Sequence, residues 1–281
     1  MSINPTNHHK SHLATRVMTF IVFVVLAVVL VQLTKSVKNN PPEENTNPIV
    51  ETNKIVDMVQ VIEIPLTSES KYGTVSGAYP QFKNANSIFN DKIRNAVVIA
   101  QSEFENNTMA NWQAQYDTKQ KNEKMDQFPP AGEFTFSVKT DYVQVNKDII
   151  SILISVSGFS GGAHGYENLI SFNYNVKTNQ EISLIDIFPN DIDYLKTLST
   201  YSRKDLTDQF TSKIKNENMD DDGDFKMTME NINSMLLPGT EPKLANFSVF
   251  TISPDVLNIH FPQYQVAAYV YGSQLVKMPL K

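Results

Sequence analysis

The chain has 281 residues, no cysteine and a formal net charge of −6 at neutral pH. The absence of cysteine excludes disulfide bridges, thiolate zinc sites and a cysteine nucleophile. The first 38 residues hold four basic residues and no acid, so the rest of the chain carries 20 basic against 30 acidic residues. A part with this negative balance repels phosphate backbones, which argues against nucleic-acid binding and favours cationic partners.

The first predicted element is a membrane-spanning helix. Residues 17–33 are apolar except for Thr19 and Gln32, and they contain no proline, glycine or charge. As a helix they extend about 25 Å, and the flanking residues bring this to the roughly 30 Å of a hydrocarbon core. We therefore expect a transmembrane helix at residues 17–35, surrounded by membrane lipid, after a tail at residues 1–16. A cleaved signal peptide is the alternative, but small residues typical of a cleavage site do not follow the apolar run.

The next segment, residues 36–54, is expected to be a polar linker. Residues 39–48 offer no apolar side chain for packing and contain three prolines, so the chain stays solvated and extended there. Such a linker would hold the following part of the chain away from the bilayer. Basic residues are balanced on the two sides of the apolar run, so the positive-inside rule leaves the orientation open.

Beyond the linker the pattern predicts an α+β fold in which antiparallel sheets pack with two main helices. Strands are expected at residues 55–64 and 73–79. A helix follows, with apolar residues at spacings of three and four: Phe89, Ile93, Val97, Ala100 and Phe104. Trp112 and Tyr116 continue this stripe, and we interpret all of it as core rather than as a ligand platform.

Alternating apolar and polar residues predict further strands in the second half of the chain. A hairpin is expected from residues 134–138 and 150–156, and another alternating run covers residues 170–176. The second helix is expected at about residues 191–215. Closing strands are then expected, at residues 247–252, 256–261 and 264–278.

Three motifs in this half resemble a known family: Ser-Gly-Gly-Ala-His-Gly at residues 160–165, Ser-Phe-Asn-Tyr at 171–174 and Ile-Ser-Leu-Ile-Asp-Ile-Phe at 182–188. The family is a bacterial envelope domain of unknown function, which forms the C-terminal half of the lysozyme-sensing anti-sigma factor RsiV. Residues 257–267 and 271–279 are similar to the last strands of that family. This part of the chain is therefore identified as RsiV-like.

An upstream motif resembles the module that precedes this domain in RsiV and in the peptidoglycan deacetylase PdaC. It consists of Tyr-Pro-Gln at residues 79–81, before the helix of Asn90 and Ile93. The resemblance implies a PdaC/RsiV-like module at residues 55–130 and an RsiV-like domain at residues 131–281. It also implies that both lie outside the cytoplasm, which gives the chain a cytoplasmic N-terminus.

The resemblance favours a binding or sensing module over the activity of either relative. About 16 residues precede the apolar run, too few for a folded sigma-binding module, and no domain with metal ligands follows the RsiV-like one. We therefore expect a non-enzymatic envelope protein that binds peptidoglycan or a lysozyme-like cationic protein. An envelope hydrolase and a structural spacer or assembly protein are the alternatives.

The ligand-binding candidates are Gly161, Gly162, His164 and Gly165, together with Tyr264 in the closing part of the resemblance. Glycines allow positive φ and leave the backbone open to the close approach of another surface. They also shape turns between strands, and this alternative stays open. His164 could donate a hydrogen bond to a ligand, or it could bond to a backbone carbonyl.

We expect no metal site and no cofactor. Only His164 and His260 are available as histidine ligands after the linker, too few for zinc. Asp220, Asp222 and Asp224 are a weak calcium candidate, but an EF-hand register started at the preceding asparagine places methionine at its twelfth position. A solvated acidic loop is favoured there.

No catalytic residue can be assigned from the sequence. The serine-hydrolase elbow is absent, because the run around Ser160 lacks its leading glycine. If the chain were a hydrolase, His164 acting with Glu167 or Asp186 would be the pair to test.

Overall fold

The computed structural model describes residues 59–70, 72–83, 85–121, 134–216 and 222–280. The described residues all belong to one compact unit, Ile55–Lys281, and Met1–Lys54 lies wholly outside them. The expected tail, transmembrane helix and linker therefore fall outside the part that the structure describes, as does the expected domain boundary after residue 130. None of the described helices has both the length and the hydrophobicity that crossing a membrane requires.

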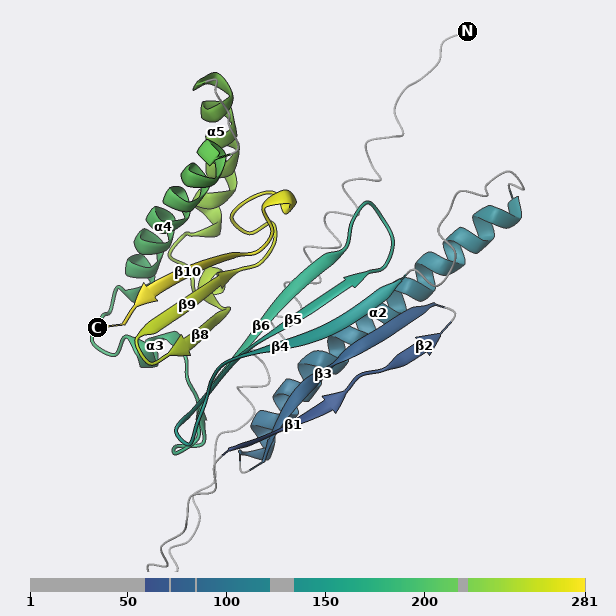
Figure 1. The fold of residues 1–281 in the computed structure, drawn as a ribbon, viewed down its shortest axis with the longest axis horizontal. Coiled ribbons are helices and arrows are strands. Elements are labelled where there is room, and N and C mark those ends of the chain that lie inside the picture. Colours follow the sequence, from purple (N-terminus) through teal and green to yellow (C-terminus); the bar gives the residue numbers. More distant parts are fainter. Residues whose placement is uncertain (1–58, 71, 84, 122–133, 217–221, 281) are drawn as a thin grey trace, which may run out of the picture. The chain divides into compact units, whose positions relative to one another are not determined.

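The larger of two sheets has the strand order β1-β3-β4-β5-β6-β7, and the short β2 pairs with β3 (Figure 1). Neighbouring strands are antiparallel except β3 and β4, which run parallel. A parallel pair needs a crossover, and helix α2 provides it. The strand bounds are Gln60–Pro65 (β1), Ser68–Ser70 (β2), Gly73–Lys83 (β3), Thr135–Val145 (β4), Ile149–Phe159 (β5), Tyr166–Asn175 (β6) and Gln180–Glu181 (β7).

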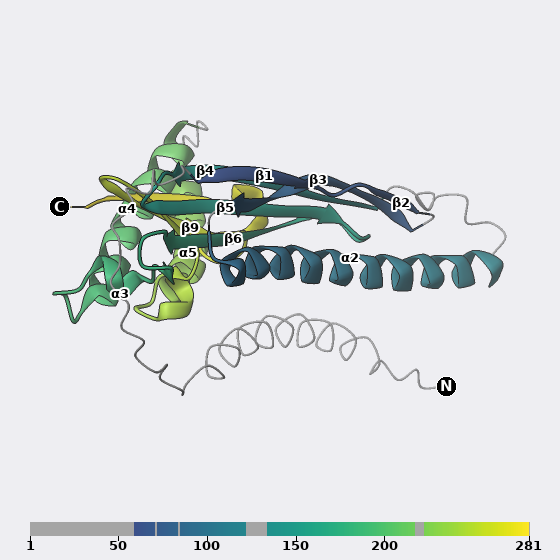
Figure 2. The same cartoon turned by 90° about the horizontal axis from the view of Figure 1, so that it is seen from below.

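Helix α2 (Ser87–Lys121) covers one face of this sheet (Figure 2). Asn86 caps its start, because the side-chain Oδ1 accepts a hydrogen bond from the N–H of Ile88 at 2.8 Å. Most of the predicted apolar stripe is buried and packs with β3, β4, β5 and β6 into a first core, which includes Phe89, Ile93, Val97, Phe104, Phe136 and Ile154. The end of the stripe departs from the prediction, since Trp112 only borders this core and Tyr116 is 47% exposed.

The C-terminal part builds a second, antiparallel sheet in the order β10-β9-β8. Its strands are β8 (Phe250–Ser253), β9 (Val256–Phe261) and β10 (Gln274–Pro279). Helices α4 (Tyr194–Asn216) and α5 (Asp222–Gly239) pack with this sheet around a second core, which includes Leu198, Leu206, Ile232, Leu236, Leu257 and Ile259. The short helices α3 (Leu184–Ile187), η1 (Leu244–Phe247) and η2 (Tyr269–Tyr271) complete this part. The α+β class with mainly antiparallel sheets is confirmed; the parallel pair β3–β4 departs from the prediction.

Helix α5 corrects the prediction of two main helices. It is a third long helix, and it begins at Asp222 inside the stretch interpreted as an acidic loop. Phe225, Met229 and Ile232 follow at helical spacing and pack into the second core, and this burial favours the helix.

The closing strand is shorter than predicted. Residues 264–278 do not form one strand, because a loop and η2 precede β10 at Gln274. Tyr264 and Gly272 adopt φ of 68° and 69°, and this left-handed conformation interrupts an extended backbone.

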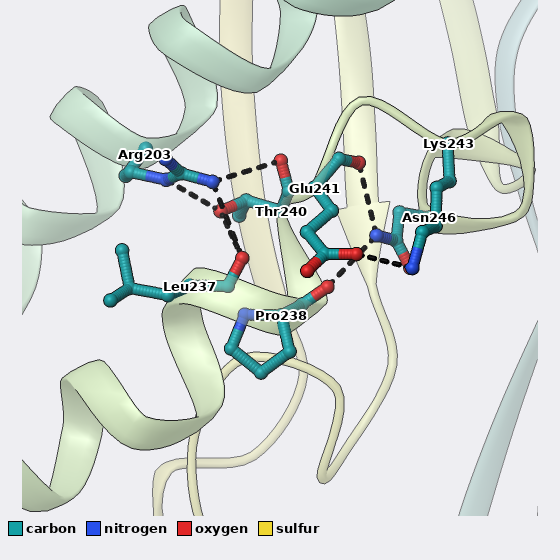
Figure 3. A network of polar contacts seen from close by, with 7 residues as sticks. All are labelled: Arg203, Leu237, Pro238, Thr240, Glu241, Lys243 and Asn246. Carbon is teal, nitrogen blue, oxygen red and sulfur yellow. Dashed lines mark hydrogen bonds and ion pairs between the residues drawn. The ribbon is translucent and has the colours of Figure 1, made fainter.

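A polar network closes the C-terminal end of α5 (Figure 3). The last carbonyl groups of a helix have no partner within the helix. Arg203 of α4 donates from Nε to Thr240 Oγ1 at 3.0 Å and from Nη2 to Leu237 O at 3.3 Å. Asn246 Nδ2 donates to Pro238 O at 3.0 Å. Since a cation at a helix C-terminus is also favoured by the helix dipole, Arg203 both caps α5 and ties it to α4.

Candidate functional site

The loop that joins β5 to β6, residues 160–165, depends on its glycines for shape, and we call it the Gly-His loop. Gly161 and Gly162 have φ of 101° and 103°, which residues with a Cβ rarely adopt. At residue 165 glycine is required for a different reason, which is the lack of space for a side chain: a Cβ there would lie 2.8 Å from Gly158 O. A Cβ on Gly162 would have no atom within 4 Å, so the loop presents bare backbone at that point.

His164 is exposed on the Gly-His loop and is held by hydrogen bonds at both ring nitrogens. Its Nδ1 lies 2.8 Å from Gly165 O. A carbonyl oxygen only accepts, so Nδ1 carries the hydrogen and Nε2 of the neutral ring accepts. The Nε2 lies 2.9 Å from the hydroxyl of Tyr264, which therefore donates to it. The structure thus brings together two predicted candidates that are 100 residues apart.

Tyr269, which the sequence interpretation did not include, completes this group. Its ring stacks on the imidazole of His164, with a centroid distance of 3.8 Å and an angle of 19° between the planes. The rings of Tyr264 and Tyr269 lie 5.7 Å apart. We call His164, Tyr264 and Tyr269 the aromatic cluster. Tyr264 is 51% exposed, and Val270, which follows Tyr269, is 80% exposed, so the cluster faces solvent.

Two polar contacts support the cluster from its sides. Asn111 of α2 donates from Nδ2 to Ser160 O, which anchors the start of the Gly-His loop. Ser273, just before β10, donates from Oγ to Glu167 Oε2 on β6 at 2.7 Å. The cluster is therefore held between two parts of the fold. Helix α2 and strand β6 of the larger sheet lie on one side, and the loop that follows β9 lies on the other.

The arrangement has the features of a ligand-binding surface. Aromatic rings with fixed polar edges bind ligands that combine flat apolar faces with hydroxyl or amide groups. Among the described side chains, neither suggested carboxylate contacts His164. Glu167 accepts from Ser273, and Asp186 accepts from the hydroxyl and N–H of Ser183 at the start of α3, which lowers the pKa of Asp186.

The calcium candidate stays a prediction. Asp220 lies outside the described residues, and Asp222 and Asp224 lie in the first turn of α5 with side chains that the structure does not describe. Within the described part of the chain, no three histidine, aspartate or glutamate side chains are grouped as metal ligands. His260 is half-buried on β9, where its Nε2 lies 3.0 Å from Thr251 Oγ1.

Two family models match the chain. The model described as deacetylase PdaC matches residues 66–167, and the model described as a protein of unknown function (DUF3298) matches residues 185–281. The chain thus matches a PdaC-like module followed by a DUF3298 domain. The resemblance to both families is confirmed, but the motif at residues 160–165, which was attributed to the RsiV-like domain, falls within the PdaC match. The aromatic cluster draws His164 from the PdaC-like module and both tyrosines from the DUF3298 domain.

One curated protein and two solved structures are similar to this chain. The peptidoglycan-N-acetylmuramic acid deacetylase PdaC of Bacillus subtilis (strain 168) is 33% identical over 141 residues, which cover 50% of this chain and 27% of that protein. The chain thus matches about a quarter of that relative's length. A DUF3298 family member from Bacteroides fragilis NCTC 9343 shares the fold, with a TM-score of 0.51 and 14% identity over 79% of this chain and 89% of that chain. For a DUF3298 family protein from Pseudomonas aeruginosa PAO1 the TM-score is 0.43, at the same identity and coverage.

Proposed function

We propose that this protein is a single-pass membrane protein whose extracytoplasmic part is a binding or sensing module of the bacterial cell envelope. The peptidoglycan-directed activity named for the PdaC relative supports an envelope location. The uninterrupted apolar run at residues 17–33 supports an anchor, with residues 1–16 in the cytoplasm. The PdaC-like module and the DUF3298 domain would then lie on the outer side of the membrane.

The observation that carries the ligand assignment is the aromatic cluster. Its tyrosine and histidine rings offer flat faces that pack against the C–H faces of sugar rings, and its tyrosine hydroxyl groups suit sugar hydroxyl and acetamido groups. The neighbouring backbone at Gly162 leaves room for a chain-like ligand to pass. These features favour the glycan strand of peptidoglycan as the ligand.

Co-sedimentation of the detergent-solubilised full chain with purified sacculi tests this assignment. Tyr264→Ala removes an exposed ring and the hydrogen bond to His164, and we expect it to weaken binding about tenfold or more. Tyr116→Ala is a matched control, because it removes a similarly exposed ring, 47% against 51%, from α2. Failure of the wild type to sediment, or equal binding by Tyr264→Ala, would reject the assignment.

A lysozyme-like cationic protein is a second candidate ligand, favoured by charge. The chain beyond residue 38 carries 20 basic against 30 acidic residues, which would attract a basic partner. Binding to lysozyme measured at low and high salt tests this candidate. We expect affinity to fall steeply with salt, and an affinity independent of salt would contradict the electrostatic argument.

We propose binding without catalysis, because the ring nitrogens of His164 are bonded to Gly165 and Tyr264 while the carboxylates of Glu167 and Asp186 are each bonded to a serine. Release of muropeptides or acetate from sacculi is the corresponding assay. The binding account predicts neither product, and turnover that His164→Ala abolishes would favour the envelope hydrolase instead.

A further inference from the structure

The two sheets have separate hydrophobic cores. One core lies between α2 and the larger sheet, and the other lies between the three-stranded sheet and helices α4 and α5. The sheets meet where β8 lies against β4, β5 and β6. On the side of the larger sheet this contact is made by residues outside both cores, whereas Phe250 and Ile252 of β8 belong to the second core.

Polar side chains of the larger sheet occupy the free edge of β8. The N–H of Phe250 donates to Ser171 Oγ at 3.0 Å, and the N–H of Ile252 donates to Ser151 Oγ at 2.8 Å. Asn173 Nδ2 donates to Phe250 O at 2.8 Å, and the Ser151 hydroxyl donates to Asn173 Oδ1 at 2.7 Å. Three side chains thus take the place of a neighbouring strand, and we call this contact the polar joint.

A joint of this kind separates more easily than a hydrophobic one. When the joint opens, each hydrogen bond is exchanged for bonds to water. The net contribution of each bond to the stability of the closed form is therefore only about 0.5–1.5 kcal/mol. Gln144, which lies opposite Ser151 in the β4–β5 register, has a buried Oε1 without a hydrogen-bond partner among the described residues. Opening would hydrate that oxygen, which further favours an open form.

The contacts around the aromatic cluster cross between the same two parts of the chain. The Tyr264–His164 hydrogen bond, the Tyr269–His164 stack and the Ser273–Glu167 hydrogen bond all connect the loop after β9 with β6 or the Gly-His loop. They lie at or near the surface, so they can break without disturbing either core.

We propose that the two cores open and close as separate units about the polar joint, and that the contacts of His164 and Glu167 form the latch that keeps it closed. This inference goes beyond the proposed function, because the joint and the latch belong to the protein without ligand. A ligand that contacts both sides of the latch stabilises the closed form by thermodynamic linkage. Ligand binding at the aromatic cluster would in this way increase the fraction of molecules whose joint is closed.

Amide hydrogen exchange of the full chain in detergent, followed at single residues without ligand, tests the joint. The N–H of Ile252 donates across the joint and reports on it, although the side chain belongs to the second core; Ile154 and Ile259 are fully buried in the first and second core. We expect Ile252 to exchange at least about tenfold faster than either core amide, because joint opening needs less free energy than global unfolding. Equal exchange at all three residues would overturn the proposal.

Two latch variants test the second half of the proposal. Tyr264→Phe removes the hydroxyl bonded to His164, and Ser273→Ala removes the donor to Glu167. Each should accelerate exchange at Ile252 by about threefold to tenfold while the core amides keep their rates. Val270→Ala, at an 80% exposed position of the same loop, is the control and should change none of them. Variants that leave Ile252 unchanged, or that accelerate all three amides equally, would show that these contacts are no latch.

Discussion

His260 lies half-buried on β9, with Nε2 3.0 Å from the hydroxyl of the buried Thr251. Burial lowers the pKa of His260 from 6.5 to about 4, although the carboxylate of Asp141 on β4 acts in the opposite direction. The unfolded chain takes up this proton near the ordinary pKa. Between these two pKa values the unfolded state binds more protons than the folded state, so folding stability falls as the pH decreases through this window.

A pKa difference of about 2.5, at about 1.4 kcal/mol per pH unit, corresponds to a loss of about 3 kcal/mol. The loss should be absent above about pH 7 and nearly complete at pH 4. His260→Gln removes the titrating ring and keeps an amide that can bond to Thr251. We therefore expect the wild type to lose about 3 kcal/mol more of its unfolding free energy than the variant between pH 7.5 and pH 4.

Urea unfolding of both proteins at the two pH values measures this difference. Carboxylates that titrate in the same range contribute equally to both proteins, so their effect cancels in the comparison. The difference in unfolding free energy between the two proteins at pH 7.5 gives the packing cost of the substitution. This cost is subtracted from the difference measured at pH 4. Equal losses on acidification would refute the conclusion that His260 is held uncharged beside the joint.

Two further substitutions test local features of the structure. Arg203→Ala should lower the unfolding free energy by about 1–3 kcal/mol, because the Leu237 carbonyl at the end of α5 loses its cationic donor; urea unfolding with a loss below about 0.5 kcal/mol would contradict this role. Gly165→Ala should cost about 1–3 kcal/mol, because its Cβ would lie 2.8 Å from Gly158 O. A thermal unfolding midpoint equal to that of the wild type would show that the Gly-His loop is not constrained in this way.

Local patterns predicted much of the larger sheet and its helix. The spacing of Phe89, Ile93 and Val97 indicated a helix with one buried face, and the structure buries all three residues. Helix α5 was missed although Phe225, Met229, Ile232 and Leu236 recur at helical spacing. The acidic run before Phe225 favoured a loop, and burial in the second core outweighs that local preference.

The candidate site shows where local patterns stop being informative. Motif resemblance singled out His164 and Tyr264, but their hydrogen bond depends on how the two sheets meet. Tyr269 was missed for the same reason, since it lies in a stretch interpreted as strand and contacts a residue about 100 positions away only through the tertiary fold. No local sign marked this stretch as solvent-facing, since the 80% exposure of Val270 is seen only in the structure.

Nuclear magnetic resonance of the ring protons of His164, Tyr264 and Tyr269 during titration with soluble peptidoglycan glycan strands tests the central claim most directly. Stacking of a sugar on the aromatic cluster would shift these ring signals in a saturable way. Our account predicts such shifts at all three rings and none at Tyr116 on α2. Saturable binding that leaves the three rings unchanged, or no binding at millimolar glycan, would contradict it.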